Sequence, residues 1–175
     1  MSQVTFSYAV LGAIDNTGQS LLQLLLPFPD KQTHAYCRSN DNVRIREGSL
    51  DNASLVADCI SSTKAVFPAV ASSDNVPGCT VAQDAARVVA SAMEKLREDV
   101  PNATAPRLVV LGSASLNERF CGDISHLARR VLFVSASNVY VALVEAEKFL
   151  RSREDWISTT FMKPGGARAR RAEGA

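Results

Sequence analysis

The sequence predicts an α/β fold, with a doubly wound parallel β-sheet covered by helices on both faces. Short apolar runs typical of buried parallel strands alternate with segments in which apolar residues recur at helical spacing. The first run is followed by a glycine-rich turn and a helix, and the chain has no internal repeat. Its 175 residues, 46% of them hydrophobic, are enough for one domain with a substantial core.

The opening segment has the shape of a dinucleotide-binding turn. Residues 8–11 predict a buried strand, Gly12 opens a tight turn, and Gly18 begins a helix, an arrangement that presents N–H groups and a helix dipole to a pyrophosphate. Asp15 lies where a second glycine normally lets the backbone approach the phosphates, so NAD(P) binding is expected but weakened. The residues expected to line the pyrophosphate are Gly12, Ala13, Ile14, Asn16, Thr17 and Gly18.

The remaining elements follow in alternation. Further strands are expected at residues 33–37, 43–46, 65–71, 108–111 and 156–162. Helices are expected after residue 51, with Ser49 or Asp51 as the cap, and at residues 81–96, 127–134 and 140–150. Pro68 interrupts one strand, because proline cannot donate to a β-ladder. The alternation implies a Rossmann-like sheet with its ligand site outside the carboxyl ends of the strands.

Composition and charge narrow the classes of function. The formal net charge of +1 gives no electrostatic case for nucleic acid, and no apolar run is long enough to cross a membrane. A signal-peptide pattern is absent, so a cytoplasmic protein is expected. The four cysteines form no CxxC pair, and His34 and His126 lack metal-ligand spacing, so no metal site is predicted. Residues 1–166 are expected to form the NAD(P)-binding domain, and residues 167–175 a disordered basic tail.

Arg38 follows the second predicted strand, where related folds select between cofactors. A guanidinium there can pair with the 2′-phosphate of NADP and stack on the adenine, and Ser39 can add a hydrogen bond. NAD-binding proteins usually present an acidic residue at this point. The sequence therefore favours NADP over NAD, with a solvated arginine among other charged residues as the alternative.

Several stretches along the chain resemble one family. They are residues 8–18, 38–39, 47–51, 69–71 and 113–115, Tyr140 with the helix after it, and residues 161–166. In order and spacing they resemble the NmrA-like, atypical short-chain dehydrogenase/reductases, and among them the averufin oxidase-like fungal oxidoreductases of polyketide pathways. The resemblance implies NADP as the cofactor and a phenolic or quinone-type aromatic substrate. It also implies cofactor contacts from Ser49, Leu50, Ala69, Val70 and Ala71.

The resemblance also implies where the chemistry takes place. Short-chain dehydrogenases use a tyrosine, a serine or threonine, and a lysine one helical turn after the tyrosine. Tyr140 begins a helix and Ser113 or Ser115 ends the fifth strand, so these three are the catalytic candidates. The lysine position is Val144, so Tyr140 is expected to act only as a hydrogen-bond donor. Lys163 is the candidate substrate-binding residue, with a solvated lysine at a strand end as the alternative.

Three departures from the family bear on function. Asp15 replaces a glycine, Pro68 interrupts a strand, and the chain turns into an Ala/Arg-rich tail after Gly166, so the fold is expected to lack most of the usual C-terminal substrate-binding segment. Two functions stay open. The first is an NAD(P)-dependent oxidoreductase acting on an aromatic polyketide-type intermediate of fungal secondary metabolism. The second is a degenerate or cofactor-free Rossmann-like protein, namely a sensor, a partner protein or a non-redox catalyst. The oligomeric state also stays open, with a homodimer as one option.

Overall fold

The computed structural model describes residues 6–28, 31–37, 45–47, 52–70, 72, 75–100, 104–113, 127, 130, 131, 134 and 136–163. Within them, parallel strands form one six-stranded sheet in the order β3-β2-β1-β4-β5-β6. The strands are β1 (Phe6–Leu11), β2 (Lys31–Cys37), β3 (Ile45–Glu47), β4 (Ala65–Pro68), β5 (Arg107–Leu111) and β6 (Thr159–Met162). The crossover from β3 to β4 reverses the direction in which strands are added, and this confirms the predicted doubly wound fold.

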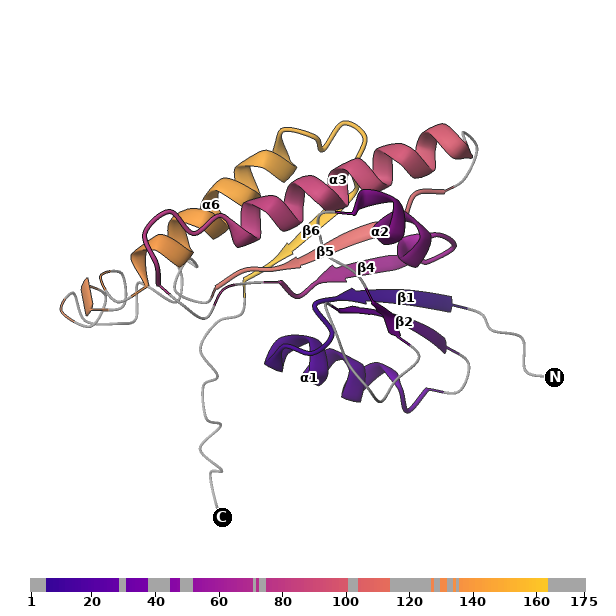
Figure 1. Ribbon diagram of the computed structural model, residues 1–175, viewed down its shortest axis with the longest axis horizontal. Helices are drawn as coiled ribbons and strands as arrows, with labels where there is room; N and C mark the ends of the chain where they lie inside the picture. Colours follow the sequence, from indigo (N-terminus) through magenta and orange to yellow (C-terminus); the bar gives the residue numbers. More distant parts are fainter. Residues whose placement is uncertain are drawn as a thin grey trace, which may run out of the picture.

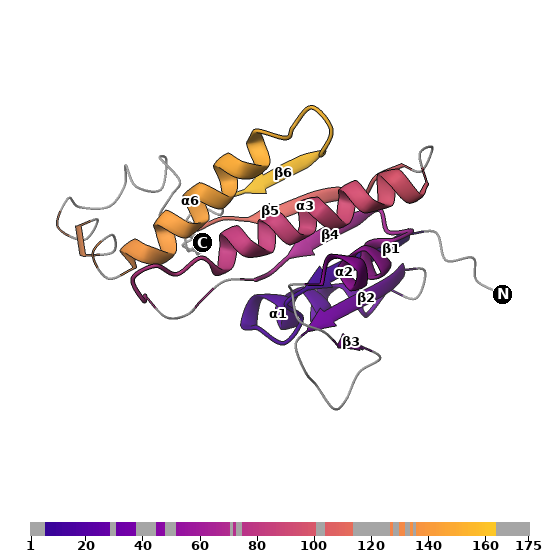
Figure 2. The ribbon, with the colours of Figure 1, turned by 45° about the horizontal axis from the view of Figure 1, so that its top comes forward.

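Helices cover this sheet from both sides. The helices described are α1 (Asn16–Leu25), α2 (Ala53–Ile60), α3 (Val81–Asp99) and α6 (Ser137–Arg151). Figure 1 shows α3 and α6 side by side over β4, β5 and β6, whereas α1 lies on the other face, below β1 and β2. The same arrangement is visible after a turn of 45° in Figure 2. Each crossover helix runs back along the sheet, so the N-termini of α1, α3 and α6 lie near the carboxyl ends of the strands.

Strand β1 divides the core between the two faces. Ala9 and Leu11 are fully buried in the larger core, which includes residues of α2, α3 and α6. Val10 is buried on the other face, where Leu21 and Leu22 of α1 pack against it. A strand buried on both sides is expected at the centre of a parallel sheet, and this packing fixes the end of β1 from which the following turn begins.

The cap of α2 differs from the one predicted. Its N-cap is Asn52, whose Oδ1 accepts a hydrogen bond from the backbone N–H of Leu55 at 3.2 Å. The prediction of Ser49 or Asp51 is therefore wrong, because the helix begins at Ala53 and the side chain that reaches its free N–H groups comes from the residue directly before it.

Two predicted strands are shorter in the structure. The strand predicted at residues 65–71 ends at Pro68, which has no N–H to continue the ladder. The strand predicted at residues 156–162 begins only at Thr159. Its first residues complete a turn after α6, since the N–H groups of Trp156 and Ile157 donate to the carbonyl of Arg153 at 3.1 and 2.8 Å.

Two further predictions concern segments that are described in part or not at all. In the helix predicted at residues 127–134, the described residues 127, 130, 131 and 134 are all helical. Residues 167–175, predicted as a disordered tail, lie outside the described residues. The division of the chain into a domain and a tail therefore stays a prediction.

Candidate functional site: the carboxyl edge of the sheet

The turn between β1 and α1 depends on Gly12. Its φ of +79° lies in the region that favours glycine, and a Cβ built there would come 2.6 Å from the carbonyl oxygen of Ala69. The N–H groups of Gly12 and Ala13 both donate to the carbonyl of Tyr36, at 2.9 and 3.2 Å, which ties the turn to the end of β2. Gly12 therefore lets the chain leave β1 through a space that has no room for a side chain.

Gly18 lets α1 pack directly on this turn. A Cβ built on Gly18 would lie 2.9 Å from the Cα of Ala13, so only glycine allows the helix to come this close. Ala13 is buried beneath the turn, whereas Ile14, Asn16 and Thr17 are exposed. The first N–H groups of a helix have no acceptor within it, and those of α1 begin at Asn16. This exposed, glycine-lined helix N-terminus fits a pyrophosphate, whose oxygens would meet N–H groups and the positive end of the dipole.

Asp15 occupies the place of the missing glycine without backbone strain. Its φ of −73° and ψ of 157° describe an extended conformation that any residue adopts. It is the N-cap residue of α1, but its exposed side chain makes no capping hydrogen bond. Nothing in the backbone at this position requires glycine. The chemical consequence of Asp15 is therefore its carboxylate beside the helix N-terminus.

The segment after β4 closes the turn from the opposite side. Pro68 is paired in register with Leu11 and has no N–H, and the next residue, Ala69, donates to the Leu11 carbonyl at 2.8 Å. A Cβ on Gly12 would also come 3.0 Å from the side chain of Val70. Ala69 and Val70 thus lie against Gly12, at the point where the resemblance implies cofactor contacts.

The catalytic candidates Ser113 and Tyr140 lie at the same edge of the sheet. Ser113 follows β5 directly after Gly112, whose N–H donates to the carbonyl of Met162 at 2.8 Å. Tyr140 lies in the first turn of α6, the helix of the crossover from β5 to β6. Both residues are half-buried. Their catalytic roles stay predictions.

Lys148 does not replace the lysine of the short-chain dehydrogenases. Its side chain is 67% exposed and pairs with Glu145 at 2.7 Å on the outer surface of α6. Val144, one helical turn after Tyr140, is half-buried and uncharged. Helix α6 therefore brings no lysine of its own beside the tyrosine.

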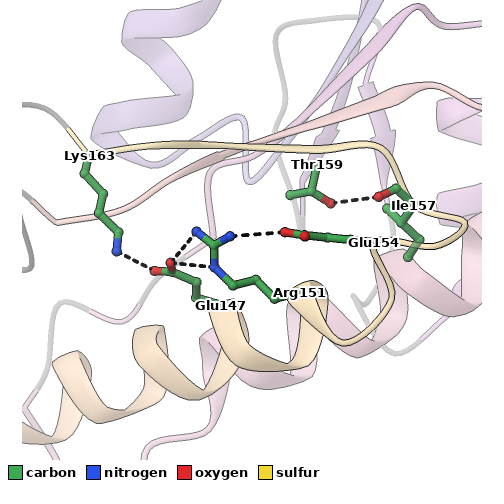
Figure 3. A network of polar contacts seen from close by, with 6 residues as sticks. All are labelled: Glu147, Arg151, Glu154, Ile157, Thr159 and Lys163. Carbon is green, nitrogen blue, oxygen red and sulfur yellow. Dashed lines mark hydrogen bonds and ion pairs between the residues drawn. The ribbon is translucent and has the colours of Figure 1, made fainter.

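Lys163 belongs to an ion-pair network that joins the end of β6 to α6 (Figure 3). Its Nζ lies 2.9 Å from Oε2 of Glu147. The other carboxylate oxygen of Glu147 accepts from Nε and Nη2 of Arg151, at 3.0 and 2.9 Å. Arg151 also donates to Glu154 at 3.1 Å and lies over the ring of Phe161, 4.4 Å from its centroid. The candidate substrate-binding lysine is thus held in place by a carboxylate.

Glu147 is well covered for a charged residue, with a side chain that is 18% exposed. Burial by itself raises the pKa of its carboxyl. The hydrogen bonds and positive charges of Lys163 and Arg151 outweigh burial, so the pKa lies below its ordinary value. The network therefore keeps a carboxylate ionised beside the sheet.

An apolar pocket lies next to this network, between the sheet and the facing sides of α3 and α6. Among the described residues that line it, the charged ones are Glu147 and Lys163. The apolar part of the lining includes Pro68, Val70, Ala82, Ala85, Leu143 and Phe161. The pocket can receive a small apolar group beside a pair of opposite charges.

Two residues of this edge, Glu147 and Asn75, were not predicted from the sequence. The spacing of Glu147 and Arg151, four residues apart on a helix, does indicate a pair. The pairing of Glu147 with Lys163 depends on the tertiary fold. The pairing of Asn75 with Asn138 also depends on it, because the two residues are 63 positions apart and are joined by hydrogen bonds of 2.9 and 3.3 Å. Neither pairing can be recognised from the spacing of nearby residues in the sequence.

Several predicted site residues lie outside the described part of the chain, and their roles stay predictions. They are Arg38, Ser39, Ser49, Leu50, Ala71 and Ser115.

Among the described residues, no cluster of three or more His, Cys, Asp or Glu is arranged to hold a metal ion. The ring Nδ1 of His34 lies 2.8 Å from the carbonyl oxygen of Cys59, which ties β2 to α2. Cys59, which is buried, and Cys79, which is half-buried, are not joined in disulfide bonds. Of the described helices, none combines the length and the apolar character needed to cross a membrane.

The strand order and the glycine turn define a Rossmann-type fold, and solved structures support this class. A short-chain dehydrogenase/reductase from Veillonella parvula in complex with NADP is 14% identical and matches 89% of this chain and 66% of its own, with a TM-score of 0.59. A short-chain dehydrogenase/reductase superfamily protein from Agrobacterium tumefaciens with bound NAD is 14% identical and matches 89% of this chain and 48% of its own, with a TM-score of 0.62. At such identities the likeness shows the fold alone.

Curated relatives show the family. Oxidoreductase aflX of Aspergillus parasiticus is 46% identical over 172 residues, which cover 91% of this chain and 64% of that protein. Oxidoreductase dmxR7 of Cryptosporiopsis sp. is 39% identical over 174 residues, which cover 91% of this chain and 73% of that protein. The chain belongs to this family of fungal oxidoreductases, which confirms the predicted resemblance to fungal oxidoreductases. The chain spans 64–65% of the length of several of these relatives. No family model matches it.

Proposed function

We propose that the chain is an oxidoreductase that uses a nicotinamide dinucleotide, with NADP preferred over NAD. The observation that supports this most directly is the turn at Gly12 and Gly18, where two glycines leave a helix N-terminus open at the carboxyl end of β1. The names of the relatives, which are oxidoreductases, and the NADP and NAD bound to two structural neighbours support the same function.

Each part of the edge has its own task in this proposal. The nicotinamide cofactor supplies the hydride acceptor or donor when it is bound. The N–H groups at the start of α1 hold the pyrophosphate, and Arg38 with Ser39, which follow β2, hold the 2′-phosphate. Ser113 and Tyr140 donate hydrogen bonds to the substrate oxygen on which charge develops. Tyr140 acts only as a hydrogen-bond donor, because Val144 stands in the position of the lysine and the helix supplies no other cation beside the tyrosine.

The substrate in this proposal is an aromatic, polyketide-type intermediate with a phenolic or quinone oxygen. The pocket beside Lys163 supports this choice, because its described lining is mostly apolar and includes one cation, Lys163, paired with one anion, Glu147. An aromatic ring would contact the apolar wall, while a phenolate oxygen would approach the ammonium group of Lys163.

Calorimetric titration of the purified protein with NADPH and with NADH tests the function. Binding of NADPH with a clear preference over NADH is expected. Arg38→Ala is expected to lower the NADPH affinity about tenfold or more, because a hydrogen bond to a charged group contributes about 1.5–3 kcal/mol. The NADH affinity is expected to fall less, because NADH has the adenine on which Arg38 can stack but lacks the 2′-phosphate. The matched control is Arg107→Ala, since Arg107 is exposed at the amino end of β5, the opposite edge of the sheet.

Failure of this test has a definite meaning. If neither dinucleotide binds to the native protein, the redox function is refuted and the chain is a Rossmann-like protein that no longer uses a dinucleotide. If NADPH and NADH bind equally and Arg38→Ala affects both equally, the oxidoreductase function survives but the preference for NADP does not.

A further inference from the structure

The N-terminus of α6 is capped from a distant part of the chain. Its own N-cap residue, Ala136, has no side chain that can accept a hydrogen bond. Instead, Oδ1 of Asn75 accepts from the backbone N–H of Asn138 at 2.9 Å, and the backbone carbonyl of Asn75 accepts from Nδ2 of Asn138 at 3.3 Å. The two asparagines thus hold each other reciprocally in a partly buried contact.

This contact lies two residues before Tyr140. The N–H of Tyr140 donates to the carbonyl of Ala136 at 3.0 Å, so the tyrosine belongs to the helical turn that Asn75 caps. Helical spacing places Tyr140 on the same face as Leu143 and Glu147, both of which line the pocket beside Lys163. Fraying of this first turn would therefore move Tyr140 relative to the pocket.

The connection between β4 and α3, which carries Asn75, begins beside the Gly12 turn. Ala69 and Val70 lie against Gly12, and Asn75 follows Val70 by five residues. The described residues of the connection between β4 and α3 therefore include Ala69 and Val70 against the turn proposed to bind the cofactor, and Asn75 against the helix that carries the proposed hydrogen-bond donor.

We propose that Asn75 is a positioning residue, which holds the first turn of α6, and with it Tyr140, in a fixed position relative to the Gly12 turn. This inference rests on the proposed function and deepens it, because it names the side chain that sets the place of the donor at the cofactor edge. Asn75 acts through the backbone of α6 and needs no contact with substrate or cofactor.

The test compares Asn75→Ala and Asn75→Asp with the wild-type protein. The aspartate variant keeps an acceptor for the Asn138 N–H and suits a helix N-terminus, so it is the conservative variant that should restore the function. Asn52→Ala is the matched control, because Asn52 caps α2 through the same kind of bond, from its Oδ1 to the N–H of Leu55. α2 lies elsewhere on the sheet and does not carry Tyr140.

Two measurements are needed on each variant. The first is amide hydrogen exchange of Asn138 by NMR, which reports the cap without any cofactor. The second is oxidation of NADPH with 9,10-phenanthrenequinone as the acceptor, with kcat and KM determined separately. Asn75→Ala is expected to speed exchange at Asn138 about tenfold and to lower kcat about tenfold to a hundredfold, since a misplacement of 1 Å can cost about a hundredfold. The KM for NADPH is expected to stay unchanged, and Asn75→Asp is expected to restore both values.

The outcomes separate this proposal from the proposed function. A wild-type kcat in Asn75→Ala, or an equal loss of kcat in Asn52→Ala, would overturn the positioning role while leaving the oxidoreductase function in place. Wild-type protein that oxidises no NADPH would refute the proposed function and this role together, whatever the exchange rates show. If Asn75→Ala does not fold, Asn75→Ser takes its place. A kcat between those of the wild type and a full loss is then expected, and a wild-type kcat would again overturn the role.

Discussion

The negative charge of Asp15 is expected to lower the affinity for NADPH by an amount that can be calculated. It lies exposed at the N-cap of α1, without a capping hydrogen bond, at the edge where the pyrophosphate is proposed to bind. Two like charges about 4 Å apart repel each other by about 1 kcal/mol in water and about 4 kcal/mol with the screening typical of a protein surface. Because each 1.4 kcal/mol or so is tenfold, removal of the charge is expected to raise the NADPH affinity between about fivefold and a thousandfold.

Asparagine and glycine variants separate the charge of Asp15 from its size. Its φ of −73° shows that the backbone does not require glycine. Asp15→Asn is therefore expected to recover most of the affinity that Asp15→Gly recovers. Calorimetric titration with NADPH measures both, and the gain is expected to shrink at high salt because exposed charges are screened. Asp155→Asn is the control, since Asp155 is exposed in the turn between α6 and β6.

Two results would contradict this reasoning. An unchanged affinity in both Asp15 variants would mean that the carboxylate does not lie near the phosphates. A gain in Asp15→Gly without one in Asp15→Asn would mean that the side chain obstructs the pyrophosphate by its volume. In that case the electrostatic argument is wrong, although the turn still binds the cofactor.

Two further predictions concern stability. Gly12→Ala is expected to lower the free energy of unfolding by clearly more than Gly78→Ala. Both glycines have a positive φ, which costs alanine about 1–2 kcal/mol. A Cβ on Gly12 would also lie 2.6 Å from a backbone oxygen, whereas a Cβ on Gly78 would meet open space. Urea denaturation measures both, and equal losses would contradict the crowding at Gly12. Glu147→Gln is expected to make the free energy of unfolding decline less steeply in acid. The folded-state pKa of Glu147 is lowered, so its carboxylate stabilises the fold above the unfolded-state pKa. This stabilisation is lost as the pH falls through the folded-state pKa, and the glutamine variant lacks it at every pH. Urea denaturation at descending pH measures it, with Glu145→Gln on the exposed surface as the control, and identical profiles for Glu147→Gln and the wild type would refute it.

The order of elements was predictable because it depends on local periodicity. The apolar run of β1 is buried on both faces, and the two glycines that follow it, Gly12 and Gly18, lie where the turn and the close helix packing require them. The geometry at Gly12 and Gly18 therefore follows from the spacing of strand, glycine and helix in the sequence. The resemblance to fungal oxidoreductases followed from the order of several weak motifs, and the relative dmxR7 confirms it.

The contacts that join distant segments were not predictable. Asn52 replaced the expected caps of α2 because several polar residues near a helix start can each supply an acceptor, and the backbone decides which one reaches. Asn75 and Asn138 are 63 residues apart, and the tertiary fold brings them into contact. A single sequence contains no periodicity that reports such a meeting.

The ion pair of Lys163 sets a condition on any anion that this lysine is proposed to hold. A phenolate must either displace the carboxylate of Glu147 or share the ammonium group with it, and an ammonium group has three donors. Displacement would leave the partly buried carboxylate with Arg151 as its remaining partner in the network and without one of the charges that lower its pKa. Sharing keeps the network of α6 and β6 intact, and it places the phenolate beside the apolar wall that Leu143 and Phe161 form. The geometry therefore favours a substrate that adds its oxygen to the existing pair.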